Sequence, residues 1–272
     1  MYFLKWLIDI FVVLLLLRLL IRPREALFDP RYRLIYRLTE PVLTPSRYLT
    51  RDVTKGAFLS ILGLVVLRAL VYLPIRPAPF ISGLGQSLLD LFHFLFQGYM
   101  VIWVVSILAK YGHATSFMYL VQRAFIPLNW VSGWLGIPRR HFHLFMFLFV
   151  WILYAILSAA IHSFLFQRTV GLPLSLFQGL GEGLILFLAL FPFPGFFALV
   201  IIIAALLSWV SPDPSNPVVQ MIYGISEPVL IPFRRYVPLL GGLDISPIVA
   251  LLCFQILGGL GQQVVAGLMR PF

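Results

Sequence analysis

The sequence "IYGISEPVLIP" at residues 222–232 is repeated almost unchanged as "IYRLTEPVLTP" at residues 35–45. Seven of the eleven positions are identical, although the two segments begin 187 residues apart. Each copy carries a Glu-Pro pair and a second proline four residues later, in a chain otherwise rich in Leu, Ile, Val, Phe and Ala. A repeat of this kind predicts that the chain contains two or more copies of one structural unit.

The composition indicates an integral membrane protein. Of the 272 residues 61% are hydrophobic and 11% are charged, with a mean hydropathy of +0.97, whereas soluble proteins contain about 25% charged residues. The net charge of +10 is interpreted as arginine-rich loops beside anionic lipid, so we expect no direct contact with nucleic acid. The single Cys253 excludes a disulfide framework and a cysteine-based metal site.

Apolar runs of about 20 residues, the length that crosses a bilayer as a helix, occur six times. They lie at about 2–21, 57–75, 85–109, 142–165, 194–210 and 245–266. Long polar linkers that contain proline follow the first, third and fifth runs, at 22–56, 110–141 and 211–244. The sequence therefore predicts an all-α integral membrane protein made of three helix–amphipathic linker–helix hairpins, which comprise residues 1–76, 77–168 and 169–272. The middle hairpin is degenerate, since "MYLVQRAFIP" at 118–127 lacks the Glu-Pro pair.

The apolar run 172–210 is too long for one crossing and is interrupted at Pro192 and Pro194. We interpret residues 173–191 as an interfacial or re-entrant helix in which Glu182 stays hydrated or paired. A seventh crossing is the alternative.

Basic residues predict the orientation of the chain. The three long linkers contain 14 of its 20 lysine and arginine residues. Because basic residues accumulate on the cytoplasmic side, we expect the linkers in the cytoplasm and both termini on the opposite side. The N-terminal apolar run lacks a small-residue cleavage site, so it is expected to be a retained helix and not a signal peptide.

The linker of the third hairpin has the pattern of an amphipathic helix lying in the membrane plane. Asn216 is a good N-cap and Pro217 a good first helical residue, and the apolar positions of 217–226 share one helix face. Because a residue before proline disfavours helical geometry, we expect the helix to end at Glu227–Pro228 and Pro232 to keep the chain extended. The first copy carries the matching residues Glu40, Pro41, Pro45 and Arg47.

Two further features of this linker have a structural interpretation. Glu227 is expected to pair with Arg234 or Arg235, as Glu40 is with Arg47. Gly241 and Gly242 are expected to turn the chain before the last membrane helix. There Asp244 or Ser246 would cap the helix and Pro247 would start it.

Residues 206–257, with the pattern SW…NP…SEPVL-x-P-x-RR-x-x-P-x-x-GG-x-D-x-SP, resemble the repeat unit of the YggT/YlmG family of small membrane proteins. The first hairpin matches that unit only in "DPRYRLIYRLTEPVLTPSRY". The resemblance implies a bacterial inner membrane or a plastid membrane. It also implies a role in cell division and nucleoid arrangement, in osmotic or ion homeostasis, or in cytochrome assembly. It brings no catalytic residues, and the usual members have two repeats whereas this chain has a third hairpin.

Ionisable residues inside apolar runs are candidates for function. Arg68 and Asp90 fall at similar depths on consecutive helices, so we expect them to pair, with extension of Arg68 to the headgroups as the alternative. Lys5 and Asp9 suggest a local pair. Asp90 with His93 is a weaker candidate for a proton relay or a metal, and His93 with His162 for haem. Since no catalytic or phosphate-binding motif is present, we expect no enzyme activity, no cofactor and no metal.

Two classes of function remain open. The first is a non-catalytic scaffold or assembly factor in the bacterial inner membrane, whose cytoplasmic linkers contact lipids and other membrane proteins or a second copy. The second is a small channel or transporter, which broken helices and polar residues near the midplane would favour. The few polar residues within the membrane and the rich linker motifs favour the scaffold.

Overall fold

The computed structural model describes residues 2–21, 30–50, 52–73, 79–108, 122–166, 171–210, 213, 216–239 and 244–270. Within these ranges the chain is helical and contains no strand, in agreement with the predicted all-α fold. The helices are α1 (Tyr2–Leu20), α3 (Pro30–Arg47), α4 (Val53–Tyr72), α5 (Phe80–Leu108), α7 (Ile126–Trp134), the short η2 (Arg139–His141), α8 (Phe142–Phe164), α9 (Leu172–Leu188), α10 (Phe196–Val210), α11 (Pro217–Tyr236) and α12 (Ser246–Met269).

Four helical segments in the described ranges are long and apolar enough to cross a membrane. These are α4, α5, the continuous segment Arg139–Phe164 and α12. The predicted crossings at 2–21 and 194–210 form the helices α1 and α10, but α1 carries three charges and α10 has only 15 residues. Helix α9 occupies the predicted interfacial segment with 17 residues. The six-crossing topology therefore stays a prediction.

The chain divides into two compact units. The first comprises Met1–Phe94 with Leu157–Leu172, and the second comprises Leu95–Ile156 with Pro173–Phe272. Each unit contains one of the two Glu-Pro segments. The division of the chain into three hairpins at 76 and 168 stays a prediction.

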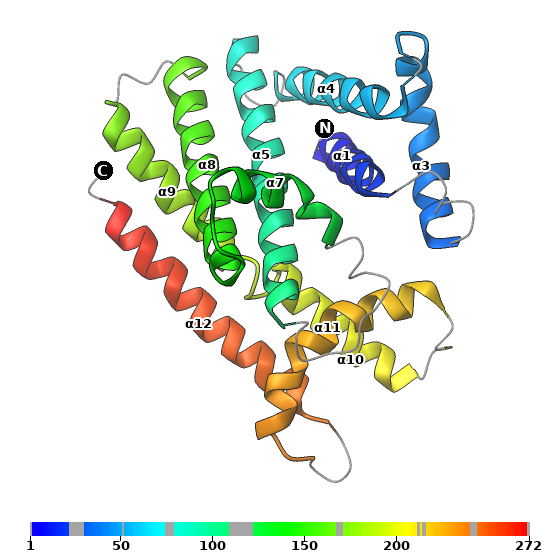
Figure 1. Ribbon diagram of the computed structural model, residues 1–272, viewed down its shortest axis with the longest axis vertical. Coiled ribbons are helices and arrows are strands. Elements are labelled where there is room, and N and C mark those ends of the chain that lie inside the picture. Colours follow the sequence, from blue (N-terminus) through cyan, green and yellow to red (C-terminus); the bar gives the residue numbers. More distant parts are fainter. Residues whose placement is uncertain are drawn as a thin grey trace. The chain divides into compact units, whose positions relative to one another are not determined.

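In the first unit α1 packs on both α3 and α4, and α3 packs on α4 (Figure 1). Small and branched side chains fill the space between these helices. Lipid is as apolar as leucine, so such burial adds little to stability in a membrane, and close packing and polar contacts count for more. The buried cluster consists of Leu15, Leu43, Ala57, Ile61 and Val65.

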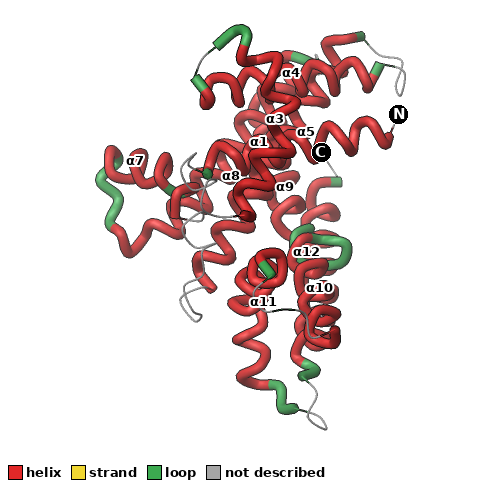
Figure 2. The backbone as a smooth tube through the Cα atoms, turned by 90° about the vertical axis from the view of Figure 1, so that its right-hand side faces the viewer, coloured by secondary structure: helices red, strands yellow, loops and turns green. Residues whose placement is uncertain are grey.

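In the second unit α10 packs on α11 and α12, and α11 packs on α12 (Figure 2). Aromatic rings join the turn between α9 and α10 to α10 and α12, since Phe191 stacks on Phe197 and meets Phe254 edge-on. Helices α8 and α9 approach closely at Gly179, where an added Cβ would lie 2.7 Å from the carbonyl oxygen of Ala155. Small residues allow such backbone approach between membrane helices.

Both Glu-Pro segments lie within continuous helices, so the predicted break at Glu227–Pro228 is wrong. Helix α11 contains Pro228 and Pro232, and α3 contains Pro41 and Pro45. The prolines of each pair are four residues apart, so both missing N–H groups fall on the same helix face. The helix can open on that face while its other hydrogen bonds remain. Each interior proline costs about 3 kcal/mol, which the packing of the opposite face offsets.

The predicted start of the helix is confirmed. Asn216 is the N-cap of α11, and its Oδ1 accepts a hydrogen bond from the backbone N–H of Val218 at 2.9 Å. Pro217 follows as the first helical residue.

Candidate functional site

The inner face of α3 is buried in the first unit and its outer face is exposed. Thr39, Leu43 and Ser46 are buried. On the outer face Leu34 is 56% and Leu38 46% exposed, and exposed arginines lie among these side chains. They are Arg33, Arg37 and Arg47. The helix therefore has one packed face and one face that combines apolar and cationic side chains.

Helix α11 has the same division in the second unit. Val219, Ile225, Val229 and Leu230 are buried. The exposed positions again combine apolar side chains with two arginines near the C-terminus of the helix. They are Val218, Met221, Arg234, Arg235 and Tyr236.

In the first unit the Glu-Pro helix holds a buried arginine from α1. The side chain of Arg18 is 4% exposed, and its Nη1 donates to Thr39 Oγ1 at 2.7 Å and to Glu40 Oε2 at 3.2 Å. The same nitrogen donates to the carbonyl oxygen of Tyr36 at 3.1 Å, and the guanidinium carbon lies 4.1 Å from the centroid of the Tyr36 ring. Carboxylate, hydroxyl, carbonyl and aromatic face thus surround one planar cation, a combination suited to arginine.

Glu40 also pairs with Arg47, as the sequence predicts. It therefore contacts two cations, one from α1 and one from the last turn of its own helix.

In the second unit the acidic residue of the motif lacks these contacts. The predicted pair of Glu227 with Arg234 or Arg235 is wrong, because Arg234 Nε instead donates to Asp244 Oδ2 at 2.8 Å. Glu227 is exposed and forms no ion pair within the described parts of the chain. Asp244 lies two residues before α12 and is the ion-pair partner of Arg234. In the first unit the corresponding partner of Arg47 is Glu40.

Asp244 also contacts the first residue of the last helix. The predicted cap at Asp244 or Ser246 is wrong, because α12 begins at Ser246 and its N-cap is Ile245, which forms no side-chain capping bond. Asp244 Oδ1 accepts a hydrogen bond from the backbone N–H of Ser246 at 2.9 Å and another from the Ser246 hydroxyl. Pro247 lies in the first turn of α12. Partial burial raises the pKa of Asp244, but the hydrogen bonds from Ser246 and Arg234 outweigh it, so the pKa lies below its usual value. Gly241 and Gly242, predicted to turn the chain, lie outside the described residues.

The predicted Arg68–Asp90 and Lys5–Asp9 pairs are both wrong, because these four residues pair between α1 and the helices beside it. Arg68 is fully buried and its Nη1 donates to Asp9 Oδ1 at 2.6 Å. Asp90 accepts from Lys5 Nζ at 3.3 Å and from the Tyr72 hydroxyl. Helix α1 thus presents Lys5, Asp9 and Arg18 to three groups of opposite charge.

Arg68 has further partners that satisfy the rest of its guanidinium. Its Nε donates to Ser87 Oγ at 3.0 Å, and Nη2 donates to the Ser87 carbonyl oxygen. Asp90 accepts an additional hydrogen bond from Gln86 Nε2 at 3.2 Å. The charged residues of α1, Lys5, Asp9 and Arg18, could have indicated these pairs in the sequence. Each charge in an apolar helix requires a partner of opposite sign on another helix.

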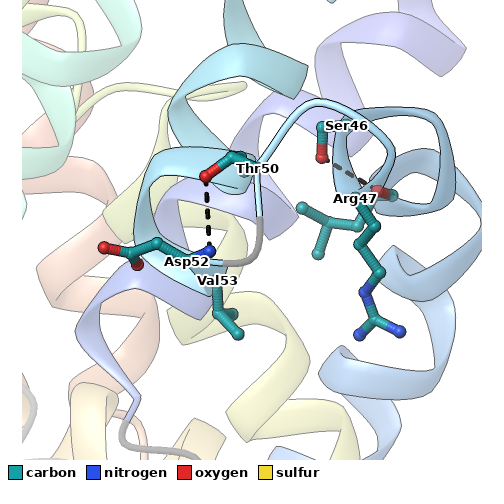
Figure 3. Close-up of a pocket in the computed structure, with 7 residues that line it drawn as sticks. Ser46, Arg47, Thr50, Asp52 and Val53 are labelled. Atoms are coloured by element: carbon teal, nitrogen blue, oxygen red, sulfur yellow. Dashed lines mark hydrogen bonds between the residues drawn. The ribbon is translucent and has the colours of Figure 1, made fainter.

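A pocket of about 290 Å³ lies at the turn between α3 and α4 (Figure 3). Its lining includes Arg47, Asp52 and the buried Gly56. Asp52 caps α4, because its Oδ1 accepts from the backbone N–H of Thr54 at 2.9 Å. The remaining lining residues are Leu43, Ser46, Thr50 and Val53.

His93 and Glu182 do not join a metal centre in the described ranges, where no three His, Cys, Asp or Glu side chains gather closely enough to bind an ion. Both are half-buried, His93 in α5 of the first unit and Glu182 in α9 of the second. His162, the other suggested haem ligand, packs against Phe166 with ring centroids 5.3 Å apart.

Comparison with known proteins finds a family match for the C-terminal part of the chain. Residues 183–265 match the CCB3/YggT family, a segment that covers the end of α9, all of α10 and α11 and most of α12. No solved structure matches the chain.

Three curated relatives match over similar lengths. Uncharacterized protein PA0392 of Pseudomonas aeruginosa is 50% identical over 62 residues, which is 23% of this chain and 30% of the relative. A protein in the proC 3' region of Vibrio alginolyticus is 41% identical over 56 residues (21% and 30%). Uncharacterized protein YggT of Escherichia coli K12 is 34% identical over 58 residues (21% and 30%).

The matching segment thus spans about a third of the length of these relatives. The family match at 183–265 contains α10, α11 and most of α12, with the Asn216 cap, the Glu-Pro pair and the Arg234–Asp244 pair. The repeat formed by these three helices is a member of the CCB3/YggT family.

Proposed function

We propose that this protein is a non-catalytic membrane scaffold or assembly factor, in which α3 and α11 lie along the membrane surface and contact lipid headgroups and partner proteins. The observation that carries this proposal is the shared design of the two helices. Each packs one face on its own unit and leaves exposed a face with apolar and arginine side chains.

Such a face suits the boundary between headgroups and acyl chains. Exposed side chains such as Leu34 and Met221 can enter the acyl region, while arginines of the same helix remain among lipid phosphates. A basic side chain near an anionic leaflet contributes about 1 kcal/mol to membrane attraction. The basic linkers favour the cytoplasmic side of a bacterial inner membrane.

The charges inside the first unit also support a scaffold. Asp9 with Arg68 and Lys5 with Asp90 form oppositely charged pairs between helices, an arrangement that fixes helices in place. A channel or transporter is the second candidate, because α9 and α10 are short helices separated by a segment with Pro192 and Pro194. Discontinuous helices of this kind line transport sites in other membrane proteins.

Affinity capture in mild detergent tests the scaffold. The wild-type chain should retain the same membrane proteins from its host cell in repeated preparations. Leu34→Ala with Leu38→Ala, on the exposed face of α3, should release them. The matched control, Leu62→Ala with Leu67→Ala, removes equally exposed leucines from α4 and should leave the captured set unchanged.

Ion flux in proteoliposomes separates the two candidates. A scaffold should give the flux of empty vesicles. Flux that depends on the protein, together with an unchanged captured set in the α3 variant, would contradict the scaffold.

A further inference from the structure

The two Glu-Pro helices differ in what their common motif binds. In the first unit Tyr36, Thr39 and Glu40 surround the guanidinium of Arg18. The corresponding positions in the second unit, 187 residues later, are Tyr223, Ser226 and Glu227. These residues lie at positions i, i+3 and i+4 of a helix, so they share one face.

The hydroxyl of the second motif is buried and unsatisfied. Ser226 is 1% exposed, and its Oγ has no hydrogen-bond partner in the part of the chain that the structure describes. Thr39, in the same place of the first motif, accepts from Arg18. A buried hydroxyl without a partner is unfavourable, so we interpret Ser226 as the acceptor for a donor from another molecule.

The carboxylate of the second motif has lost both of the cations that Glu40 contacts. Arg234, the counterpart of Arg47, bonds Asp244. Helix α10 packs on α11 as α1 packs on α3, but α10 contains no basic residue.

Arg18 and Ser208 occupy comparable positions in the preceding helices. The buried face of α1 contains Val12 and Leu15 and continues to Arg18, the third residue from the end of the helix. In α10 the buried face contains Ile201 and Ala204, whereas Ser208, again the third residue from the end, is exposed. Helix α10 thus ends with an exposed serine, whereas α1 ends with a buried arginine.

We propose that Tyr223, Ser226 and Glu227 form a binding site for an arginine side chain carried by a partner membrane protein. The partner's guanidinium would donate to Glu227 and to Ser226 Oγ and lie against the Tyr223 ring, as Arg18 does in the first unit. An arginine fits better than a lysine or a lipid amine, because only a planar guanidinium makes forked hydrogen bonds while it stacks on a ring. This inference rests on the proposed scaffold function and names the chemistry of the partner.

Carboxyl labelling of the full chain measures the state of the site. In detergent-purified protein, a carbodiimide activates carboxyl groups and the amine of glycine ethyl ester then forms the amide with release of the urea. Glu227 should be labelled at least about fivefold faster than Glu40, which is held by two arginines. In native membranes, where the partner is present, the rate at Glu227 should fall toward that of Glu40. Equal rates at Glu227 before and after purification would overturn the proposal that a partner occupies the site.

Dodecylguanidine is the probe for the guanidinium itself, and dodecyltrimethylammonium is the control cation without hydrogen-bond donors. Dodecylguanidine should slow labelling of Glu227 at a concentration about fivefold lower than the control requires. Ser226→Ala should reduce this preference by about fivefold, the effect of one hydrogen bond. Equal protection by both amphiphiles, or no effect of Ser226→Ala, would contradict an arginine site.

An arginine supplied within the chain gives a second, independent test. Ser208→Arg should slow labelling of Glu227 and abolish the effect of dodecylguanidine, whereas Ser208→Gln should change neither. Failure of these tests leaves the capture and flux results for the scaffold untouched, so the two proposals are judged separately.

Discussion

The first unit and the second unit use the same Glu-Pro helix in different electrostatic surroundings. In the first, Glu40 contacts Arg18 and Arg47. In the second, Glu227 is exposed, and Arg234 is held by Asp244. The difference shows that the motif itself determines the helix and its faces, whereas the helix that packs beside it determines whether the carboxylate is paired inside the unit.

The largest effect is expected at Arg68, which ties α1 to α4 and α5. Arg68→Leu leaves Asp9 without its cation in an apolar environment, so it should lower the free energy of unfolding by about 3–5 kcal/mol. The fraction of folded protein recovered in detergent and its thermal midpoint measure this. Arg68→Leu with Asp9→Leu should recover much of the loss. A single Arg68→Leu variant as stable as wild type would show that the pair does not hold α1.

A smaller effect is expected at Arg18, and it distinguishes the two units directly. Arg18→Leu removes four hydrogen bonds to Tyr36, Thr39 and Glu40, so it should destabilise the protein by about 2–4 kcal/mol. Ser208→Leu, at the comparable position of α10, should change stability by less than about 0.5 kcal/mol. Equal thermal midpoints for the two variants would remove the distinction between the units.

The prolines of the Glu-Pro pairs are expected to matter less, because the helices continue through them. Pro228→Ala restores a backbone N–H in the interior of α11. It should stabilise the protein by up to about 3 kcal/mol, the cost of an interior proline, less about 0.4–1 kcal/mol for the greater freedom of the unfolded chain. Circular dichroism of the purified chain should show unchanged or slightly greater helix content. A large loss of helix would show that the proline is needed for the packing of α11.

The smallest effect is expected at Asp244. Its pair with Arg234 is partly exposed, so Asp244→Asn should cost about 0–1 kcal/mol at neutral pH. Because the pKa of Asp244 is lowered in the folded protein, its contribution is present above the pKa of the unfolded chain. That contribution is lost as the pH falls through the folded pKa. The stability difference between wild type and Asp244→Asn, measured from neutral to acid pH, should therefore shrink in acid, and a difference that grows would contradict this sign.

Local patterns predicted the features that depend on neighbours in sequence. The Asn216 cap, the Pro217 start and the Glu40–Arg47 pair all involve residues at most seven positions apart. The continuation of α3 and α11 through their prolines was not predicted, because local preference disfavours it and tertiary packing decides it.

Partners between helices were harder to predict. The pairing of Arg68 with Asp9 spans 59 residues, and depth along consecutive helices favoured Asp90 instead. A third helix, α1, determines which residues pair, because it places Lys5 beside Asp90 and Asp9 beside Arg68. The predicted Arg68–Asp90 pair depended only on the depths of these residues on α4 and α5.

The depth of the two Glu-Pro helices tests the central proposal most directly. With Cys253→Ser as background, a bimane label at Leu34→Cys or Val218→Cys would be examined in vesicles whose lipids carry bromine at defined acyl positions. If α3 and α11 lie along the membrane surface, both labels should be quenched most strongly by bromine near the headgroups and weakly by bromine at the bilayer centre. Strong quenching at the centre, or no quenching at either position, would contradict α3 and α11 as surface helices.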